Sequence, residues 1–254
     1  FLMYLIIDIG NTNIVFAIYE NAGIVSSWRI ATLAKRTSDE YLLWLNQIIK
    51  GNFKIKKIII GSVVPDVLFE IHNACKVGFR KKIFIINDNL KINFPSNVLN
   101  RSEVGADRIV NALFSWETYK RASIIIDFGT ATTFDVVNKK GVYLGGVICP
   151  GINLSLQALY SAAARLPKIA VSKPKKVIGN NTIDAMSSGI YWGYISLIKG
   201  LLEKIKLELK DSNVIILATG GLSNFFAKEV SSSIVINKDL TIHGLYLAHK
   251  NYRK

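Results

Sequence analysis

The sequence has few of the residues that build disulfide frameworks or metal sites. Among its 254 residues there are two cysteines and three histidines, and none of them stands in a CxxC or HExxH pattern. We therefore expect neither a disulfide scaffold nor a zinc site. The scarcity of cysteine is typical of a reduced, cytoplasmic protein.

Long apolar runs are missing as well, although half of the residues are hydrophobic and the mean hydropathy is +0.29. The longest runs, such as LMYLII near the start, have the length of a strand and end at Asp, Gly or Lys. A membrane-spanning helix needs about 20 apolar residues, and the first residues lack the basic start and cleavage site of a secretory signal. We therefore expect no association with a membrane.

Acidic residues are scarce relative to basic ones, 18 against 32, which gives a net charge of +14. Such a surface favours anionic ligands, either nucleic acid or a small substrate such as ATP. The basic residues stand in short, separated clusters, KIKK, RKK and KPKK, without interleaved stacking aromatics. This pattern is more typical of solvated surfaces, so no nucleic-acid partner is expected.

Turn signals and hydrophobic periodicity predict an α/β layer in the first half of the chain. A capping box of Thr37 and Glu40 marks the start of a helix, and Gly51 stands where that helix would be capped at its end. No long linker follows, so any two lobes would pack closely. The expected elements are strands at 3–9, 14–19 and 24–30, the capped helix, a strand within 55–64, a helix at 66–79 and a strand at 82–86.

The second half is predicted to repeat this layer in structure, with little identity in sequence. Two unrelated strand–turn motifs are the alternative interpretation. The expected elements are a helix at about 103–120, strands at 123–127, 132–137 and 142–148, helices at 153–164 and, in one or two pieces, across 183–209, strands at 214–221 and 232–236, and a short closing helix.

Each half carries a turn of the form Asp-x-Gly followed by small polar residues. In DIGNTN, Asp8 ends a buried strand and Gly10 lets the backbone approach a ligand, and in DFGTATT the same places are held by Asp127 and Gly129. A carboxylate beside a phosphate requires a cation between them, and Mg²⁺ prefers one or two carboxylates together with phosphate oxygens. Since neither a Walker A pattern nor GxGxxG occurs, we predict that these two turns hold a nucleotide phosphate chain.

The stretch EVGADR has catalytic character. Asp107 and Arg108 follow Gly105 near the expected start of a helix, where a carboxylate stays ionised and an arginine can face an anionic substrate. An ionised aspartate within reach of a hydroxyl can take its proton as the oxygen attacks a γ-phosphate. Taken alone, the stretch fits a plain surface Asp–Arg pair at least as well.

Two glycine pairs lie within or at the end of expected strands. GGLS at 220–223 could let a base or ribose lie against the backbone, or could simply form a tight turn. GGVICPG at 145–151 combines two glycines, a strand end and Pro-Gly before a helix.

Taken in order, DIGNTN, EVGADR, DFGTATTFDVV, GGVICPG and NNTIDAMSSGI resemble the type III pantothenate kinases over essentially the whole chain. These kinases belong to the actin-like, Hsp70- and sugar-kinase-related ATPase superfamily. The resemblance implies an α/β, duplicated ribonuclease-H-like fold, with lobes at 3–116 and 117–254 and a central nucleotide cleft. It also implies a homodimer that phosphorylates the 4′-hydroxyl of pantothenate with ATP and Mg²⁺, the first step of coenzyme A biosynthesis.

The resemblance also assigns roles to individual residues: Asp107 would be the general base, and Asp127 would hold a monovalent cation, K⁺ or NH₄⁺. ATP would be bound by Asp8, Ile9, Gly10, Asn11, Thr12, Asn13, Ile14, Val15 and Thr130. Pantothenate would be bound by Val98, Gly105, Ala106, Asp107, Arg108 and Thr182. The family usually carries Tyr-x-x-Pro-Arg before Gly-Ala-Asp-Arg, whereas here Val98 replaces the tyrosine and Arg101-Ser102 replaces Pro-Arg. The alternatives are another small-alcohol or sugar kinase of this superfamily and a non-catalytic, nucleic-acid-binding regulator on the same fold.

Overall fold

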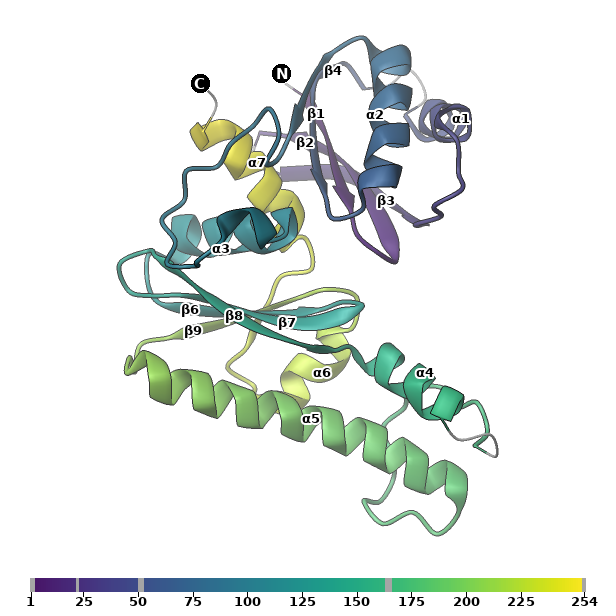
Figure 1. Cartoon of the computed structure of the whole chain (residues 1–254), viewed down its shortest axis with the longest axis vertical. Coiled ribbons are helices and arrows are strands. Elements are labelled where there is room, and N and C mark those ends of the chain that lie inside the picture. Colours follow the sequence, from purple (N-terminus) through teal and green to yellow (C-terminus); the bar gives the residue numbers. More distant parts are fainter. Residues whose placement is uncertain (1–2, 22, 50–52, 163–165, 253–254) are drawn as a thin grey trace. The chain divides into compact units, whose positions relative to one another are not determined.

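A computed structural model describes residues 3–21, 23–49, 53–162 and 166–252. The chain forms two compact units, which we describe separately (Figure 1). The first unit comprises Phe1–Thr118 and Asp239–Lys254, and the second comprises Tyr119–Lys238. Among the described residues, no helix is long and apolar enough to cross a membrane.

The first unit contains a five-stranded sheet in the order β3-β2-β1-β4-β5. β1 pairs antiparallel with β2 and parallel with β4, so the chain runs through a three-strand meander before its first helix. The elements are β1 (Met3–Ile9), β2 (Asn13–Glu20), β3 (Gly23–Ala31), α1 (Ser38–Ile48), β4 (Ile55–Ser62), α2 (Pro65–Phe79), β5 (Lys82–Ile85), η1 (Arg101–Glu103), α3 (Ala106–Tyr119) and, at the end of the chain, α7 (Leu240–Tyr252).

The second unit repeats this topology strand for strand. Its sheet has the order β8-β7-β6-β9-β10, with β6 antiparallel to β7 and parallel to β9. The predicted duplication is therefore confirmed, with β6 in the place of β1 and β9 in the place of β4. The elements are β6 (Ser123–Phe128), β7 (Ala131–Val137), β8 (Tyr143–Pro150), α4 (Ile152–Ala162), α5 (Thr182–Leu209), β9 (Ile215–Thr219), α6 (Ser223–Val230) and β10 (Val235–Ile236).

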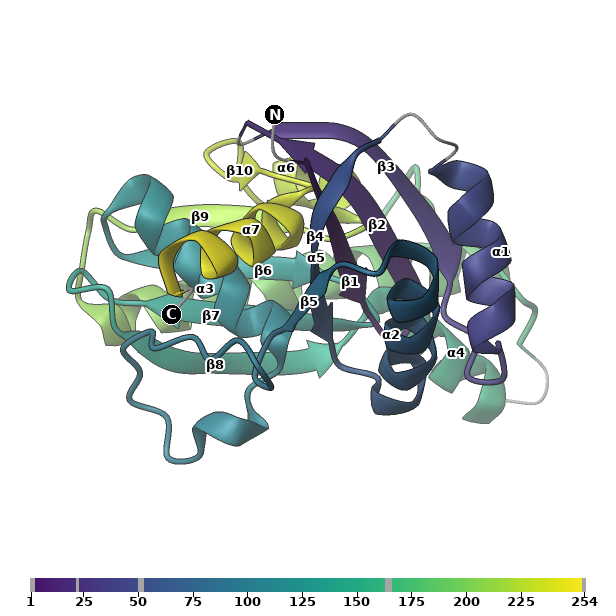
Figure 2. The ribbon, with the colours of Figure 1, turned by 90° about the horizontal axis from the view of Figure 1, so that it is seen from above.

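Each sheet buries an apolar face beneath helices. In the first unit α1 and α2 lie on one side of the sheet and α7 lies on the other (Figure 2). Leu5, Ile7 and Ile9 of β1 alternate with residues of the other face and pack into the core beneath α1 and α2. In the second unit the core lies between the sheet and α5 and α6 (Figure 1).

Local signals located the first helix correctly. Thr37 accepts a hydrogen bond from the Glu40 N–H, and the Glu40 carboxylate accepts one from the Thr37 N–H, so the predicted capping box is confirmed. The helix ends at Ile48 with Ile49 as its cap, and Gly51, the predicted cap, lies outside the described residues.

Two predictions were wrong in detail. α3 begins at Ala106 rather than near residue 103, because η1 first uses Asn100 as its cap. The last predicted strand shrinks to Val235–Ile236. Gly145 and Gly146, by contrast, lie inside β8, within the strand predicted at 142–148 and beside the irregular pairing of Val136 and Val137.

The closing helix α7 packs in the first unit, whereas the sequence predicts a second lobe that runs to residue 254. Its Leu245 side chain lies against Gly61 of β4, where a Cβ atom would come within 2.7 Å of it. Gly244 likewise lets α7 cross α3, since a Cβ there would lie 2.3 Å from the Val110 carbonyl oxygen. These close glycine contacts tie α7 to the first sheet and to α3.

Candidate active site

Asp8 lies at the carboxyl edge of the first sheet. It is the penultimate residue of β1 rather than a turn residue, and it pairs with Val15 of β2 and Gly61 of β4. Because β1 and β4 are parallel, their carboxyl ends meet at one edge, and the Val63 N–H extends this pairing by donating to the Ile9 carbonyl at 3.1 Å.

The turn after Asp8 is held together by a hydrogen bond within its own backbone and by Thr32, the residue directly after β3. The Gly10 N–H donates to the Asn13 carbonyl at 3.0 Å, and the Thr32 hydroxyl donates to the Gly10 carbonyl at 2.7 Å. The Thr32 N–H also donates to the Thr12 carbonyl at 2.9 Å. Thr32 was not predicted as a site residue, because nothing local marks a loop threonine as the clamp of a distant turn.

The predicted ATP-binding residues of this turn divide into two groups. Asn11, Thr12 and Asn13 are exposed, so a ligand at this turn would meet them. Ile9 and Ile14 are fully buried in the core beneath α1 and α2, so only their backbone atoms could contact one.

Asp107 lies at the first turn of α3, and its position depends on Gly105. A Cβ atom at residue 105 would come within 2.5 Å of the Asp107 Oδ1 atom and 3.3 Å of the Val63 side chain. Since Val63 follows β4 and bonds to Ile9, Asp107 belongs to the same sheet edge as Asp8. Sequence spacing could not reveal this proximity.

Different parts of the surroundings shift the pKa of the Asp107 carboxyl in opposite directions. Burial raises the pKa of the Asp107 carboxyl above its ordinary value, whereas the Arg108 N–H, which donates to Oδ1 at 2.8 Å, and the Arg108 charge lower it. The side chain nevertheless keeps part of its surface accessible. Asp107 is therefore a sheltered acid at a helix N-terminus and not a surface ion-pair residue.

Asp127 occupies the corresponding edge of the second sheet. It is the penultimate residue of β6 and pairs with Thr133 of β7 and Thr219 of β9. Gly220, which follows β9 with φ +87°, lies so close that a Cβ atom there would be 2.4 Å from Asp127 Oδ1 and 2.7 Å from the Phe128 backbone nitrogen. The GGLS glycines thus have separate roles: Gly220 makes room for Asp127, while a Cβ atom at Gly221 would meet nothing within 4 Å.

Gly129 and Thr130 form the exposed second turn, and Thr130 provides its hydroxyl. The Gly129 N–H donates to the Ala131 carbonyl at 3.2 Å, and the Gly151 N–H donates to the Thr130 carbonyl at 3.1 Å. A Cβ atom at Gly151 would lie 2.3 Å from that carbonyl oxygen, which explains the glycine directly after β8.

The two threonines of β7 are less exposed, and their hydroxyls are bonded within the second unit. Thr132 is fully buried, and its hydroxyl is hydrogen-bonded to the Tyr194 hydroxyl of α5 at 2.5 Å. Burial raises the pKa of Tyr194 to about 12, so this phenol stays neutral. Thr133 donates to buried Asp135 at 3.4 Å. Of the polar residues in DFGTATT, Thr130 is therefore the exposed hydroxyl.

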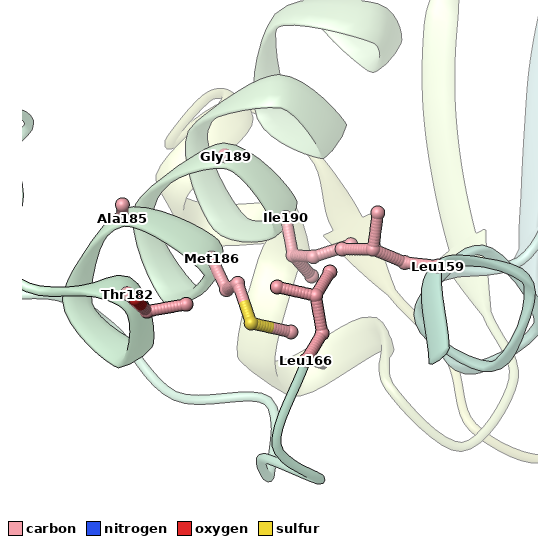
Figure 3. A pocket seen from close by; sticks show the side chains of 7 residues that line it. All are labelled: Leu159, Leu166, Thr182, Ala185, Met186, Gly189 and Ile190. Carbon is pink, nitrogen blue, oxygen red and sulfur yellow. The ribbon is translucent and has the colours of Figure 1, made fainter. Parts of the chain in front are cut away.

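Other predicted site residues lie away from these edges. Thr182 is the first residue of α5, in the wall of an apolar pocket of about 470 Å³ that α4 and α5 share (Figure 3). The pocket is lined by Leu159, Leu166, Thr182, Ala185, Met186, Gly189 and Ile190. Gly145 and Gly146 line a different pocket against α5, at the end of β7 far from Thr130.

The loop before Asp107 is organised by Asn100. Its side-chain oxygen accepts from the Ser102 N–H at 3.2 Å, and its amide donates to Glu103 at 2.6 Å. The Arg101 guanidinium donates to the Ile92 carbonyl. Val98, which is half-buried, therefore lies in a loop ordered by polar contacts of its neighbours rather than by Pro-Arg.

The donor set fits Mg²⁺ held partly by a ligand. Among the described residues, no three His, Cys, Asp or Glu side chains gather into a complete metal cage. Mg²⁺ takes one or two carboxylates and completes its shell with water and phosphate oxygens, and Asp8 at the edge of the first sheet can contribute one such carboxylate.

Comparison with known proteins decides the family. The sequence model described as "Type III pantothenate kinase" matches residues 4–204. The chain belongs to the type III pantothenate kinase family. It is 46% identical to the type III pantothenate kinase of Paramagnetospirillum magneticum, over 98% of this chain and 97% of that protein, and 41% identical to that of Geotalea uraniireducens, over 99% and 100%.

Solved structures agree on the fold. A Campylobacter jejuni protein described as a candidate Baf family transcriptional activator superposes with a TM-score of 0.61 at 23% identity, with 97% of each chain covered. A ROK family glucokinase from Streptomyces griseus superposes with a TM-score of 0.52 at 11% identity, with 99% of each covered. At these identities the likeness supports the two-lobed, duplicated ribonuclease-H-like fold that the sequence predicts, and no activity.

Proposed function

We propose that this chain transfers the γ-phosphoryl group of ATP to the 4′-hydroxyl of pantothenate, the first step of coenzyme A biosynthesis. Membership of the type III pantothenate kinase family is the observation that carries this proposal. The grouping of Asp8 and the sheltered Asp107 at one sheet edge is the chemistry that such a transfer needs.

Asp107 is the general base of the proposed reaction. Its ionised carboxylate takes the proton of the hydroxyl while the hydroxyl oxygen forms a bond to the γ-phosphorus. The bond between that phosphorus and the β,γ-bridging oxygen breaks, and ADP leaves. The Arg108 N–H and the start of α3 support the ionised form against the burial that raises the pKa of Asp107.

The two sheet edges divide the binding of ATP. In the first unit Gly10 and the exposed residues 11–13 contact phosphate oxygens, and Asp8 would face them through Mg²⁺. In the second unit Thr130 contacts the phosphates, and Asp127 would hold K⁺ or NH₄⁺. Mg²⁺ would supply positive charge that neutralises the transferred phosphoryl group. The single carboxylates, the exposed turns and the close approach of Gly220 to Asp127 support this division.

Pantothenate is held by Val98, Gly105, Ala106, Arg108 and Thr182. Because Thr182 lies in the wall of a pocket at the start of α5 and not against Asp127 or Thr130, we assign its contact to the substrate of a second subunit in a homodimer. The protein acts in the cytoplasm and has no nucleic-acid partner, in keeping with its separated basic clusters.

A turnover assay with pantothenate and Mg-ATP, in K⁺ and then in Na⁺, tests the proposal. We expect ADP release that requires pantothenate and is strongest in K⁺. Phosphate transfer to a sugar but not to pantothenate would assign the chain to another kinase of this fold. Salt-sensitive binding to random-sequence duplex DNA, without turnover, would favour the regulator instead.

A further inference from the structure

A row of polar side chains runs along one face of α3. Asp107, Asn111 and Ser115 follow one another at intervals of four residues, so they lie along one strip of the helix. The residues that separate Asn111 from its two neighbours in the row are mostly buried and apolar. A polar strip inside a buried helix is unfavourable unless its groups are hydrogen-bonded.

Asn111 is the member of this row whose hydrogen bonding is incomplete. The side chain is 1% exposed, and its Oδ1 atom has no hydrogen-bond partner in the part of the chain that the structure describes. A buried carbonyl of this kind destabilises the fold. An apolar side chain of the same size would avoid that cost, so stability does not explain an asparagine here.

The direction of the side chain relates Asn111 to Asp107. Side chains of a helix lean toward its N-terminus, so Asn111 lies over the turn that carries Asp107. The helix α7 contacts a neighbouring strip of α3 instead, through Gly244 against Val110 and through the His243 ring stacked on Phe114 at 5.6 Å.

We propose that Asn111 is a positioning residue for Asp107: its carboxamide, directly or through one bound water, holds the carboxyl group in the orientation that accepts the proton of the substrate. This role rests on the proposed function. An amide suits it, since its N–H donates to a carboxylate and its oxygen accepts from water or from the acid that Asp107 becomes. Asn111 would therefore act on the reaction through Asp107, without contact to substrate.

The first test replaces Asn111 with leucine, which has the same branching and the same number of side-chain heavy atoms but no polar atoms. We expect Asn111→Leu to keep the melting temperature of the wild type or to raise it, because a buried acceptor without a partner is removed. The kcat for pantothenate should fall about 10- to 100-fold, because the base is misplaced. The KM for ATP should stay unchanged.

The second test uses Asn111→Asp, which keeps the shape and brings a second acid beside Asp107. Two neighbouring carboxyls raise the pKa of one of them, so the ¹³C titration of the Asp107 carboxyl should move up by about one unit or more. Arg108 is the charged side chain that acts on Asp107, and it is unchanged in this variant. Tyr41→Phe, which removes one buried hydroxyl from α1 on the far face of the sheet, is the matched control and should leave kcat and the titration unchanged.

The outcomes are distinct. A kcat for Asn111→Leu within twofold of that of Tyr41→Phe would overturn the proposal, as would an Asp107 titration that Asn111→Asp does not move. If Asn111→Leu fails to fold, the asparagine is structural and the proposal is again overturned. A wild-type protein that transfers no phosphate to pantothenate would refute the proposed function, while the carboxyl titration would still decide whether Asn111 acts on Asp107.

Discussion

The turn after Asp8 and the turn after Asp127 have the same place in two copies of one topology, but they are built differently. Residues 10–12 separate β1 from β2, whereas only Gly129 and Thr130 separate β6 from β7, so the first turn is one residue longer. The first turn exposes Asn11 and Thr12 and is held from outside by the Thr32 hydroxyl.

The second turn is instead enclosed by backbone. Gly220 and Gly151 approach Asp127 and Thr130 so closely that neither position has room for a Cβ atom. The longer turn can offer several side-chain groups to a phosphate chain, while the tighter one holds a single carboxylate and hydroxyl in fixed positions. This difference agrees with a division of labour in which the first turn binds phosphates and the second binds one cation.

The largest expected effect concerns the acid that belongs to neither turn. If the two turns bind the ATP phosphates and a cation while Asp107 alone moves a proton, Asp107→Asn should lower kcat by about 10²- to 10⁴-fold. The KM for ATP should change by less than about twofold, because the substitution removes no contact that binds ATP in the ground state. Steady-state kinetics with circular dichroism as a folding control measures this, and a rate near that of the wild type would remove Asp107 from its assigned role.

Alanine in place of Gly10, in the first turn, and of Gly220, which packs against Asp127 beside the second turn, tests the contrast between the two constructions. Gly220→Ala forces a side chain into φ +87° and against Asp127 Oδ1, and we expect it to lower the free energy of unfolding by about 1–3 kcal/mol. It should also weaken activation by K⁺. Gly10→Ala meets only the Asn13 carbonyl, at 3.1 Å, and should change stability by less than about 1 kcal/mol. If chemical denaturation gave the same loss of unfolding free energy for both variants, the two turns would not differ in construction as described.

The sequence predicts these two turns from local patterns. Alternating apolar residues give the strands, and Asp-x-Gly marks the point where each strand ends, so the placement of Asp8 and Asp127 needed no knowledge of packing. The capping box at Thr37 was readable for the same reason, since its two hydrogen bonds join residues three apart.

Contacts between residues far apart in the chain could not be predicted from the sequence. Gly220 packs against Asp127 although it follows a strand much later in the chain. Thr32 holds the turn at Gly10 although the whole β2–β3 hairpin lies between them. The closing helix joins the first unit because Gly61 and Gly244 allow close approach, which no periodicity reveals. Such contacts depend on how the elements pack, and a glycine or threonine looks the same in sequence whether or not it makes them.

A pair of isosteric threonine variants separates ligand binding from stability. Thr32→Val removes the hydroxyl that holds Gly10, and the KM for ATP should rise by up to about fivefold, equivalent to about 1 kcal/mol. Thr132→Val leaves the buried Tyr194 hydroxyl without its partner and should lower the free energy of unfolding by about 1–3 kcal/mol with little change in KM. Thermal unfolding and ATP titrations of both variants would show whether the effects divide in this way.

The smallest expected effect is a pH-dependent gain in stability from Asp107→Asn. Burial raises the pKa of Asp107 in the folded chain, so the folded state binds this proton more tightly than the unfolded state. The wild type therefore loses stability as the pH rises toward the folded pKa, and the loss is complete above it. Asparagine carries no such cost, so the variant should melt a few degrees higher than the wild type at neutral pH. The difference should disappear in acid below the unfolded pKa, and a difference that grows in acid would mean that the ionised carboxylate is stabilised by its surroundings.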